Sequence, residues 1–169
     1  MLINNFWDII EKSYQGSEGI QEKQVELLKA ALEEETSDTI KRYCIYLMGL
    51  LKKASTEEFW ACYYLINGGY EEWGFEDFRY WVIAHGRDFW EASLANPVEH
   101  LYNNVNIKIG DNPDVTFYEF WAIFKNTYEA KSDNELNHSF EWMKVYEEVQ
   151  NKEFEVEKVM RPKAHDYEN

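Results

Sequence analysis

Apolar side chains recur at helical spacing along most of this chain. Between Ser37 and Lys53 the apolar residues Ile40, Cys44 and Leu47 lie three or four positions apart, which places them on one face of an α-helix. The same spacing predicts a helix that ends near Gly16, helices over about 20–35, 75–84 and 87–95, and helices that begin after Ser55, Thr116 and Ser132. The sequence therefore predicts an all-α fold, a single compact domain of seven or eight helices.

Polar residues mark where several of these helices begin. Ser55 precedes Glu58 by three positions, which is the spacing of a capping box, so we expect Ser55 to cap the helix that ends at Asn67-Gly68-Gly69. Two similar pairs occur later in the chain: Thr116 with Glu119, and Ser132 with Glu135.

Residues 98–115 interrupt the helical pattern. Val105, Ile107 and Ile109 alternate with polar residues, which predicts at most one short β-strand pair near residues 104–110. Beyond Lys152 the chain is charged and poor in apolar positions. We therefore expect a helical domain over residues 1–152 and a charged, partly ordered tail over residues 153–169.

The dipeptide Phe-Trp occurs at four places, and an acidic residue directly precedes three of them. The four are Phe6-Trp7, Phe59-Trp60, Phe89-Trp90 and Phe120-Trp121. An acid in the first turn of a helix suits the helix dipole, and two adjacent large rings can anchor that turn in the core. We interpret the dipeptides as packing elements rather than binding elements.

The net charge indicates which kind of partner the protein can bind, and the cysteines and the lack of a long apolar run indicate its cellular compartment. The net charge is −15, which disfavours nucleic-acid binding and favours a basic partner, although an acidic surface also serves solubility alone. Cys44 and Cys62 lie in helical patterns without zinc or disulfide spacing, so we expect buried thiols. The sequence shows no signal peptide and no apolar run long enough to span a membrane, so we expect a cytoplasmic protein without a membrane partner.

Arg79 is the most conspicuous candidate for binding chemistry. It lies among aromatic residues, where a guanidinium group either pairs with a carboxylate such as Glu76 or holds an anionic ligand. The ligand alternative would use a pocket formed by Tyr63, Trp73, Phe78, Arg79 and Trp81, with Glu76 or Asp77 positioning Arg79. We expect His85, which precedes Gly86, to bond carbonyl groups at a helix end rather than to act in catalysis. The acidic loop 111–114 lacks the frame of a calcium loop, and neither a metal nor a cofactor is predicted.

The central stretch resembles a bacterial family catalogued as domain of unknown function 4240. The similar positions are Phe6-Trp7, the run from Tyr64 to Gly69, the pattern Phe75, Phe78-Arg79, Trp81-Val82-Ile83 and Gly86-Arg87, and the later run from Tyr118 to Trp121. The likeness covers about residues 5–130. It departs at His85, where the family commonly has a polar residue such as Gln, and the tail past Lys152 has no counterpart. The resemblance implies a mostly helical single domain, and since the family has no established activity it assigns no catalytic residue.

Two hypotheses of function remain open. In the first, the chain is a non-enzymatic interaction module, such as an immunity-type protein that masks a basic partner, because it is strongly acidic and rich in Trp and Tyr. In the second, it is a small-ligand binder or an enzyme built around the aromatic pocket with Arg79. No spacing typical of a catalytic centre favours the second hypothesis.

Overall fold

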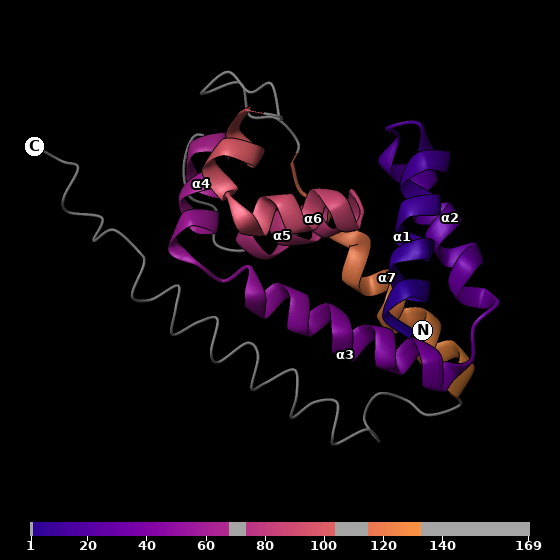
Figure 1. Ribbon diagram of the computed structural model, residues 1–169. Coiled ribbons are helices and arrows are strands. Elements are labelled where there is room, and N and C mark those ends of the chain that lie inside the picture. The colour runs from indigo at the N-terminus through magenta and orange to yellow at the C-terminus, as the bar shows by residue number, and fades with distance from the viewer. Residues whose placement is uncertain (1, 68–73, 104–114, 133–169) are drawn as a thin grey trace, which may run out of the picture.

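Helices account for nearly all of the residues that the computed structural model describes, which are 2–67, 74–103 and 115–132 (Figure 1). In chain order they are α1 (Leu2–Ser17), α2 (Gln21–Glu33), α3 (Ser37–Lys53), α4 (Glu57–Asn67), α5 (Gly74–Ala84), α6 (Arg87–Ala95), the π-helical turn η1 (Val98–Tyr102) and α7 (Glu119–Ser132). The predicted all-α, single-domain fold is confirmed. The strand pair predicted near 104–110, the helix predicted after Ser132 and the tail over 153–169 lie outside the described residues.

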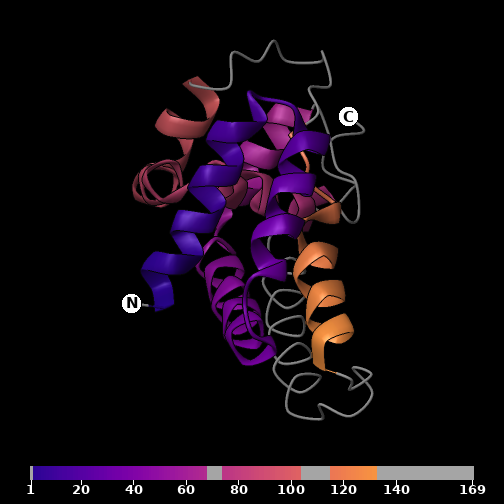
Figure 2. The same cartoon turned by 90° about the vertical axis from the view of Figure 1, so that its right-hand side faces the viewer.

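Helix α3 connects the two halves of the molecule. In Figure 1 it runs along the base of the fold, with α1, α2 and α7 at one end and α4, α5 and α6 at the other. It contacts α1, α5 and α7, and Figure 2 shows α7 alongside α2, with which it is also in contact. α3 can serve both halves because its apolar stripe is broad: its buried residues are Ile40, Tyr43, Cys44, Leu47, Met48, Leu50 and Leu51.

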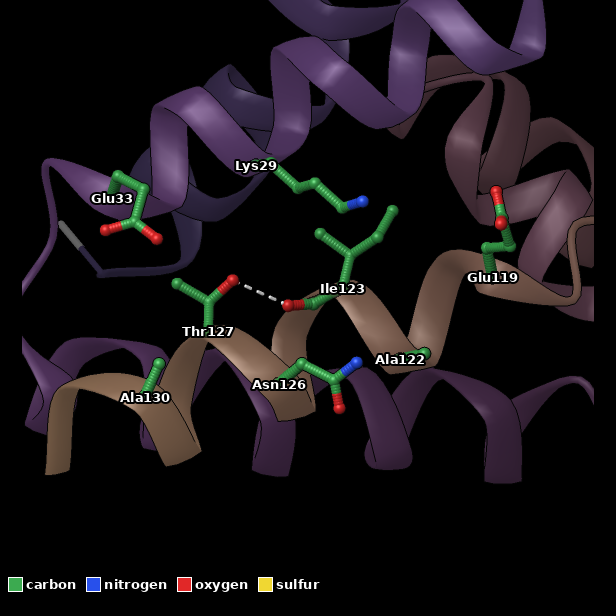
Figure 3. A pocket seen from close by; sticks show the side chains of 8 residues that line it. All are labelled: Lys29, Glu33, Glu119, Ala122, Ile123, Asn126, Thr127 and Ala130. Carbon is green, nitrogen blue, oxygen red and sulfur yellow. Dashed lines mark hydrogen bonds between the residues drawn. The ribbon is translucent and has the colours of Figure 1, made fainter. Parts of the chain in front are cut away.

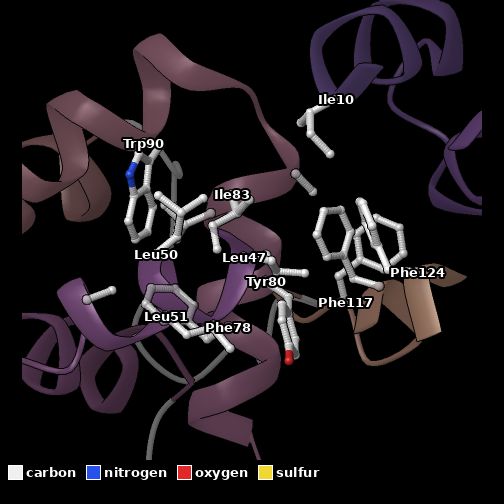
Figure 4. Packing of buried hydrophobic residues seen from close by; sticks show 14 of the residues in the cluster. Ile10, Leu47, Leu50, Leu51, Phe78, Tyr80, Ile83, Trp90, Phe117 and Phe124 are labelled. Carbon is white, nitrogen blue, oxygen red and sulfur yellow. The ribbon is translucent and has the colours of Figure 1, made fainter. Parts of the chain in front are cut away.

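Aromatic rings fill much of the core between these helices (Figure 4). The Phe6 ring packs edge-on against Tyr43 at 5.7 Å and lies 5.9 Å from Phe124, joining α1 to α3 and α7. In each of the four Phe-Trp dipeptides, both rings are either buried in the core or packed against it. The interpretation of these dipeptides as packing elements is therefore confirmed.

The predicted helix boundaries are right for α3 and α6 but wrong at two N-termini. The hydroxyl that caps α4 belongs to Thr56, which accepts a hydrogen bond from the Phe59 amide at 3.3 Å. Ser55 lies one residue too early and donates instead to the carbonyl of Leu51 at 3.2 Å. The predicted cap at Thr116 is also wrong, because α7 begins only at Glu119.

The late start of α7 has a physical cause in the packing of Phe117. The Phe117 amide donates to the carbonyl of Asp77 on α5 at 3.0 Å, and its ring is buried beside Phe120, with ring centroids 5.2 Å apart. This segment is therefore bonded to the first turn of α5 before the helix starts. The chain also stays helical beyond Pro97, through η1, where the sequence predicted a change of character.

Candidate functional site

Arg79 lies wholly inside the protein, with a side chain that is 0% exposed. Its Nη1 donates to the carbonyl of Leu51 at 3.2 Å and to the hydroxyl of Ser55 at 2.6 Å. Its Nε donates to the carbonyl of Phe75 at 3.3 Å. Leu51 belongs to the last turn of α3, so this guanidinium group ties α5 to the C-terminus of α3.

The charge of Arg79 is stabilised where it lies. The C-terminus of a helix carries a partial negative charge, which favours a cation at the end of α3. The guanidinium carbon also lies 4.3 Å from the centroid of the Phe75 ring, within the range of a cation–π contact. These contacts support a structural role for Arg79, and its complete burial gives no support to an anion-binding role.

The other residues of the predicted aromatic pocket pack against one another. The Tyr63 and Phe78 rings lie 5.7 Å apart, and the Phe78 ring stacks on Trp81 at 6.2 Å. Glu76 accepts a hydrogen bond from the Tyr80 hydroxyl at 3.0 Å. The structure thus brings Tyr63, Phe78 and Trp81 together as packed rings, while Trp73 lies outside the described residues.

Asp77 is the candidate residue with a clearly perturbed carboxyl group. Partial burial and, to a smaller extent, the nearby Glu76 raise its pKa, Arg79 lowers it, and the net result is a pKa of about 6 in place of 3.8. At neutral pH Asp77 is therefore a carboxylate whose surroundings in the fold disfavour its negative charge.

A shallow groove of about 300 Å³ lies between α2 and α7 (Figure 3). Lys29 and Glu33 line it from α2, and Glu119, Asn126 and Thr127 line it from α7. The Thr127 hydroxyl is already used, because it donates to the Ile123 carbonyl at 2.8 Å. The groove mixes both signs of charge, and nothing in its geometry selects a particular ligand.

A smaller pocket of about 110 Å³ is lined by polar and aromatic side chains together. We call it the Gln24 pocket, and its walls come from the α1–α2 turn, the end of α5 and the segment before α7. Its lining includes the side chains of Tyr14, Gln21, Gln24, Trp81, His85 and Phe117. Sequence reasoning missed this pocket. One signal was available: Gln24 adjoins Val25 on the buried face of α2, where an apolar residue is expected.

His85 occupies one wall of the Gln24 pocket in a stack of rings. Its ring lies 4.1 Å from Trp81, 4.7 Å from Phe89 and 4.7 Å from Tyr14. Its Nδ1 bonds the Trp81 carbonyl at 2.7 Å, which confirms the prediction that this histidine bonds a carbonyl at a helix end. Burial lowers the pKa of His85 below its usual 6.5, so the ring is neutral at pH 7.

Comparison with known proteins places the chain in a family but gives it no activity. A family model described as "Protein of unknown function (DUF4240)" matches residues 1–130. The chain belongs to the DUF4240 family. No curated protein matches it, and no solved structure does.

The segment from α5 to η1 of this DUF4240 protein carries five acidic residues and two arginines. Its acidic residues are Glu76, Asp77, Asp88, Glu91 and Glu99. Of its two arginines, Arg79 is buried and Arg87 pairs with Glu91 at 2.7 Å, while Asp88 and Glu99 are exposed. Within the described ranges, no three His, Cys, Asp or Glu side chains are grouped as metal ligands would be, and none of the helices has the length and apolarity to cross a bilayer.

Proposed function

We propose that this DUF4240 protein is a non-enzymatic interaction module that binds a basic protein in the cytoplasm, in the manner of a bacterial immunity protein. The supporting observation is the excess of acidic over basic residues, with a net charge of −15, to which the exposed Asp88, Glu91 and Glu99 of α6 and η1 contribute. Surfaces of one charge speed the encounter with an oppositely charged partner and disfavour partners of the same charge.

Exposed apolar side chains accompany these carboxylates. Val98 is 50% exposed and directly precedes Glu99, and Tyr118 is 69% exposed and directly precedes Glu119. Interfaces combine such apolar anchors, which supply much of the affinity, with charged groups that set specificity and rate. Acidic residues beside exposed apolar ones therefore fit a protein partner better than they fit simple solvation.

The alternative function, a ligand pocket built on Arg79, receives less support. Every hydrogen bond described above for Arg79 ends on a backbone carbonyl or on Ser55, and the side chain has no exposed surface. An anionic ligand could reach the guanidinium group only if the packing around it opened.

The proposal is tested by recovering the partner and then reversing the charge of acidic residues on α6 and η1. Tagged protein is used to capture binding proteins from the native host at low salt, and the candidate is purified and bound again in isolation. The double substitution Asp88→Lys with Glu99→Lys is compared with Glu26→Lys with Glu34→Lys, which changes the net charge equally on and just after α2.

We expect the first pair to slow association with the purified partner about tenfold at low salt, and the α2 pair to slow it much less. The difference should shrink as salt is raised, because screening weakens exposed charges. Failure to recover any basic protein, or equal behaviour of the two variants, would count against the proposal.

A further inference from the structure

The Gln24 pocket has an unusual inventory of polar atoms. Gln24 is only 5% exposed, and its Nε2 donates to the Ala84 carbonyl at 2.8 Å and to the Ser13 hydroxyl at 3.3 Å. A backbone carbonyl can only accept, so the amide nitrogen must occupy this position. The Gln24 side-chain oxygen is left as an acceptor, and no residue that the structure describes donates to it.

Gln21 and His85 are fixed in the same way. The Nε2 of Gln21 donates to the Thr116 carbonyl at 2.8 Å, which leaves the Gln21 side-chain oxygen as an acceptor. The Trp81 carbonyl that His85 bonds also only accepts, so the proton of the neutral ring lies on Nδ1 and Nε2 carries a lone pair. Neither acceptor receives a hydrogen bond from the residues in the described ranges.

The residues that line the pocket therefore carry three acceptors, on Gln21, Gln24 and His85, and three aromatic rings, those of Tyr14, Trp81 and Phe117. An ammonium group has three N–H donors and no acceptor, so it matches the side-chain oxygens and the Nε2 atom in number and kind. Aromatic faces attract cations, and Trp does so most strongly. An anion would find no free donor on His85 or Gln24, whose N–H groups already bond within the fold.

Size and surroundings point to the end of a protein side chain rather than to a large ligand. A pocket of about 110 Å³ admits an ammonium group with a short alkyl stem. Ile20 lies between two lining residues in sequence and is 52% exposed, while the 69% exposed Tyr118 adjoins Phe117. These side chains give a protein surface something apolar to contact around the pocket.

We propose that the Gln24 pocket binds a primary ammonium group, and that this group is the end of a lysine side chain on the basic partner. The first half stands on the pocket alone, and the second half rests on the proposed function.

The first experiment uses n-propylammonium chloride as the probe, with 1-propanol as a neutral molecule of the same size and tetramethylammonium chloride as a cation without N–H donors. The full chain is labelled with nitrogen-15, and the side-chain signals of Trp81 and Gln24 are followed at pH 7. We expect saturable shifts with propylammonium at a Kd of about 1–10 mM, the range open to a ligand of four heavy atoms. Propanol and tetramethylammonium should cause much smaller shifts.

Two substitutions test the acceptors. His85→Phe keeps a ring in the stack but removes the Nε2 lone pair, and Gln24→Leu removes the amide oxygen. Both should weaken propylammonium binding at least fivefold, whereas Gln15→Leu, at an exposed position of α1, should not change it. Thermal melts identify a variant that fails to fold, and Gln21→Met then replaces it. Equal shifts with propanol and propylammonium would show that the pocket does not select an ammonium group, and no shift with either would show that neither binds. Both results would overturn the proposal.

The second experiment uses the purified partner and separates the two proposals. If the lysine assignment holds, His85→Phe weakens the partner's binding about tenfold or more, and acetylation of the partner's lysines abolishes the difference between His85→Phe and the unsubstituted protein. If the partner binds both forms equally, the lysine assignment fails and the proposed function stands. If propylammonium binds but no basic protein does, the proposed function fails together with the lysine assignment, and the pocket is a site for free amines.

Discussion

Replacing Arg79 distinguishes a structural cation from a ligand-binding one. The guanidinium group joins α5 to the last turn of α3 through Leu51 and Ser55, and its stem is fully buried. Arg79→Ala removes the charge, its hydrogen bonds and cation–π contact, and the packing of the stem, whereas Arg79→Met keeps most of the stem and removes only the charge and its contacts. The two substitutions therefore separate the contributions.

The structure sets the size of each effect. Arg79→Ala removes two buried methylene groups, which contribute about 1.6 kcal/mol at about 0.8 kcal/mol each. The hydrogen bonds contribute less than their number suggests, because the Leu51 carbonyl also accepts from the Ala54 amide at 3.1 Å and from the Ser55 hydroxyl, so it keeps partners when Arg79 is removed. Loss of a buried charge also returns part of its desolvation cost. We expect Arg79→Ala to lower the free energy of unfolding by roughly 3–4 kcal/mol and Arg79→Met by roughly 1–2 kcal/mol.

Urea denaturation followed by circular dichroism measures both values. A double-mutant cycle of Arg79→Met with Ser55→Ala should give a coupling of about 1 kcal/mol, because the two side chains are bonded at 2.6 Å. The structural interpretation would be refuted if Arg79→Ala left the free energy of unfolding within about 0.5 kcal/mol of the unsubstituted value while abolishing binding to the partner.

Three further predictions concern side chains near the core. A Cβ atom at Gly74 would lie 2.1 Å from the Tyr63 hydroxyl, so Gly74→Ala should destabilise the fold by about 1–3 kcal/mol. Adding Tyr63→Phe should recover part of that loss in thermal melts. Strictly additive effects of the two substitutions would contradict the clash. The pKa of Asp77 in the fold, about 6, exceeds its ordinary 3.8, so the folded state binds the proton more tightly than the unfolded state does. The free energy of unfolding therefore falls as the pH rises from about 3.8 through about 6. Asp77→Asn should therefore stabilise the protein by about 1–2 kcal/mol at pH 8, after allowance for partial exposure, and the gain should vanish near pH 4; a gain independent of pH would exclude ionisation as its cause. Burial raises the pKa of Cys62 to about 11 and that of Cys44 further, so both thiols should react with a disulfide reagent at pH 8 only after urea is added, and rapid labelling of the folded protein would show that they are accessible.

The sequence was sufficient to predict the helices and much of the core, because burial there follows a local period. The stripe of α3 fixes which of its residues face inward, and the structure buries Ile40, Cys44, Leu47 and Leu51 as predicted. The caps of α4 and α7 were predicted wrongly for a different reason. Ser55 fits a capping box by spacing alone, but its hydroxyl is engaged by Leu51 and by Arg79, which lies 24 residues away in the chain. Local rules fail where a distant residue competes for the same atom.

The Gln24 pocket could not be predicted because its polar geometry depends on distant backbone atoms. Gln24 bonds a carbonyl 60 residues away, and Gln21 bonds one 95 residues away. Neither distance leaves a trace in local spacing. A buried Gln on an apolar helix face was the only local signal, and that signal indicates a satisfied polar group without naming its partner.

Arg79 and Gln24 share one feature: each side chain donates a hydrogen bond to a carbonyl group at a helix C-terminus. Side-chain donors are repeatedly directed to the carbonyl groups at helix C-termini: Arg79 to Leu51 of α3, Gln24 to Ala84 of α5, and Lys131 to Glu33 of α2. Helix C-termini leave such carbonyls without partners inside the helix, so these bonds stabilise the ends of α2, α3 and α5. Arg79 and Gln24 are buried, so their bonds join helix ends inside the core, whereas the Lys131 bond lies at the surface.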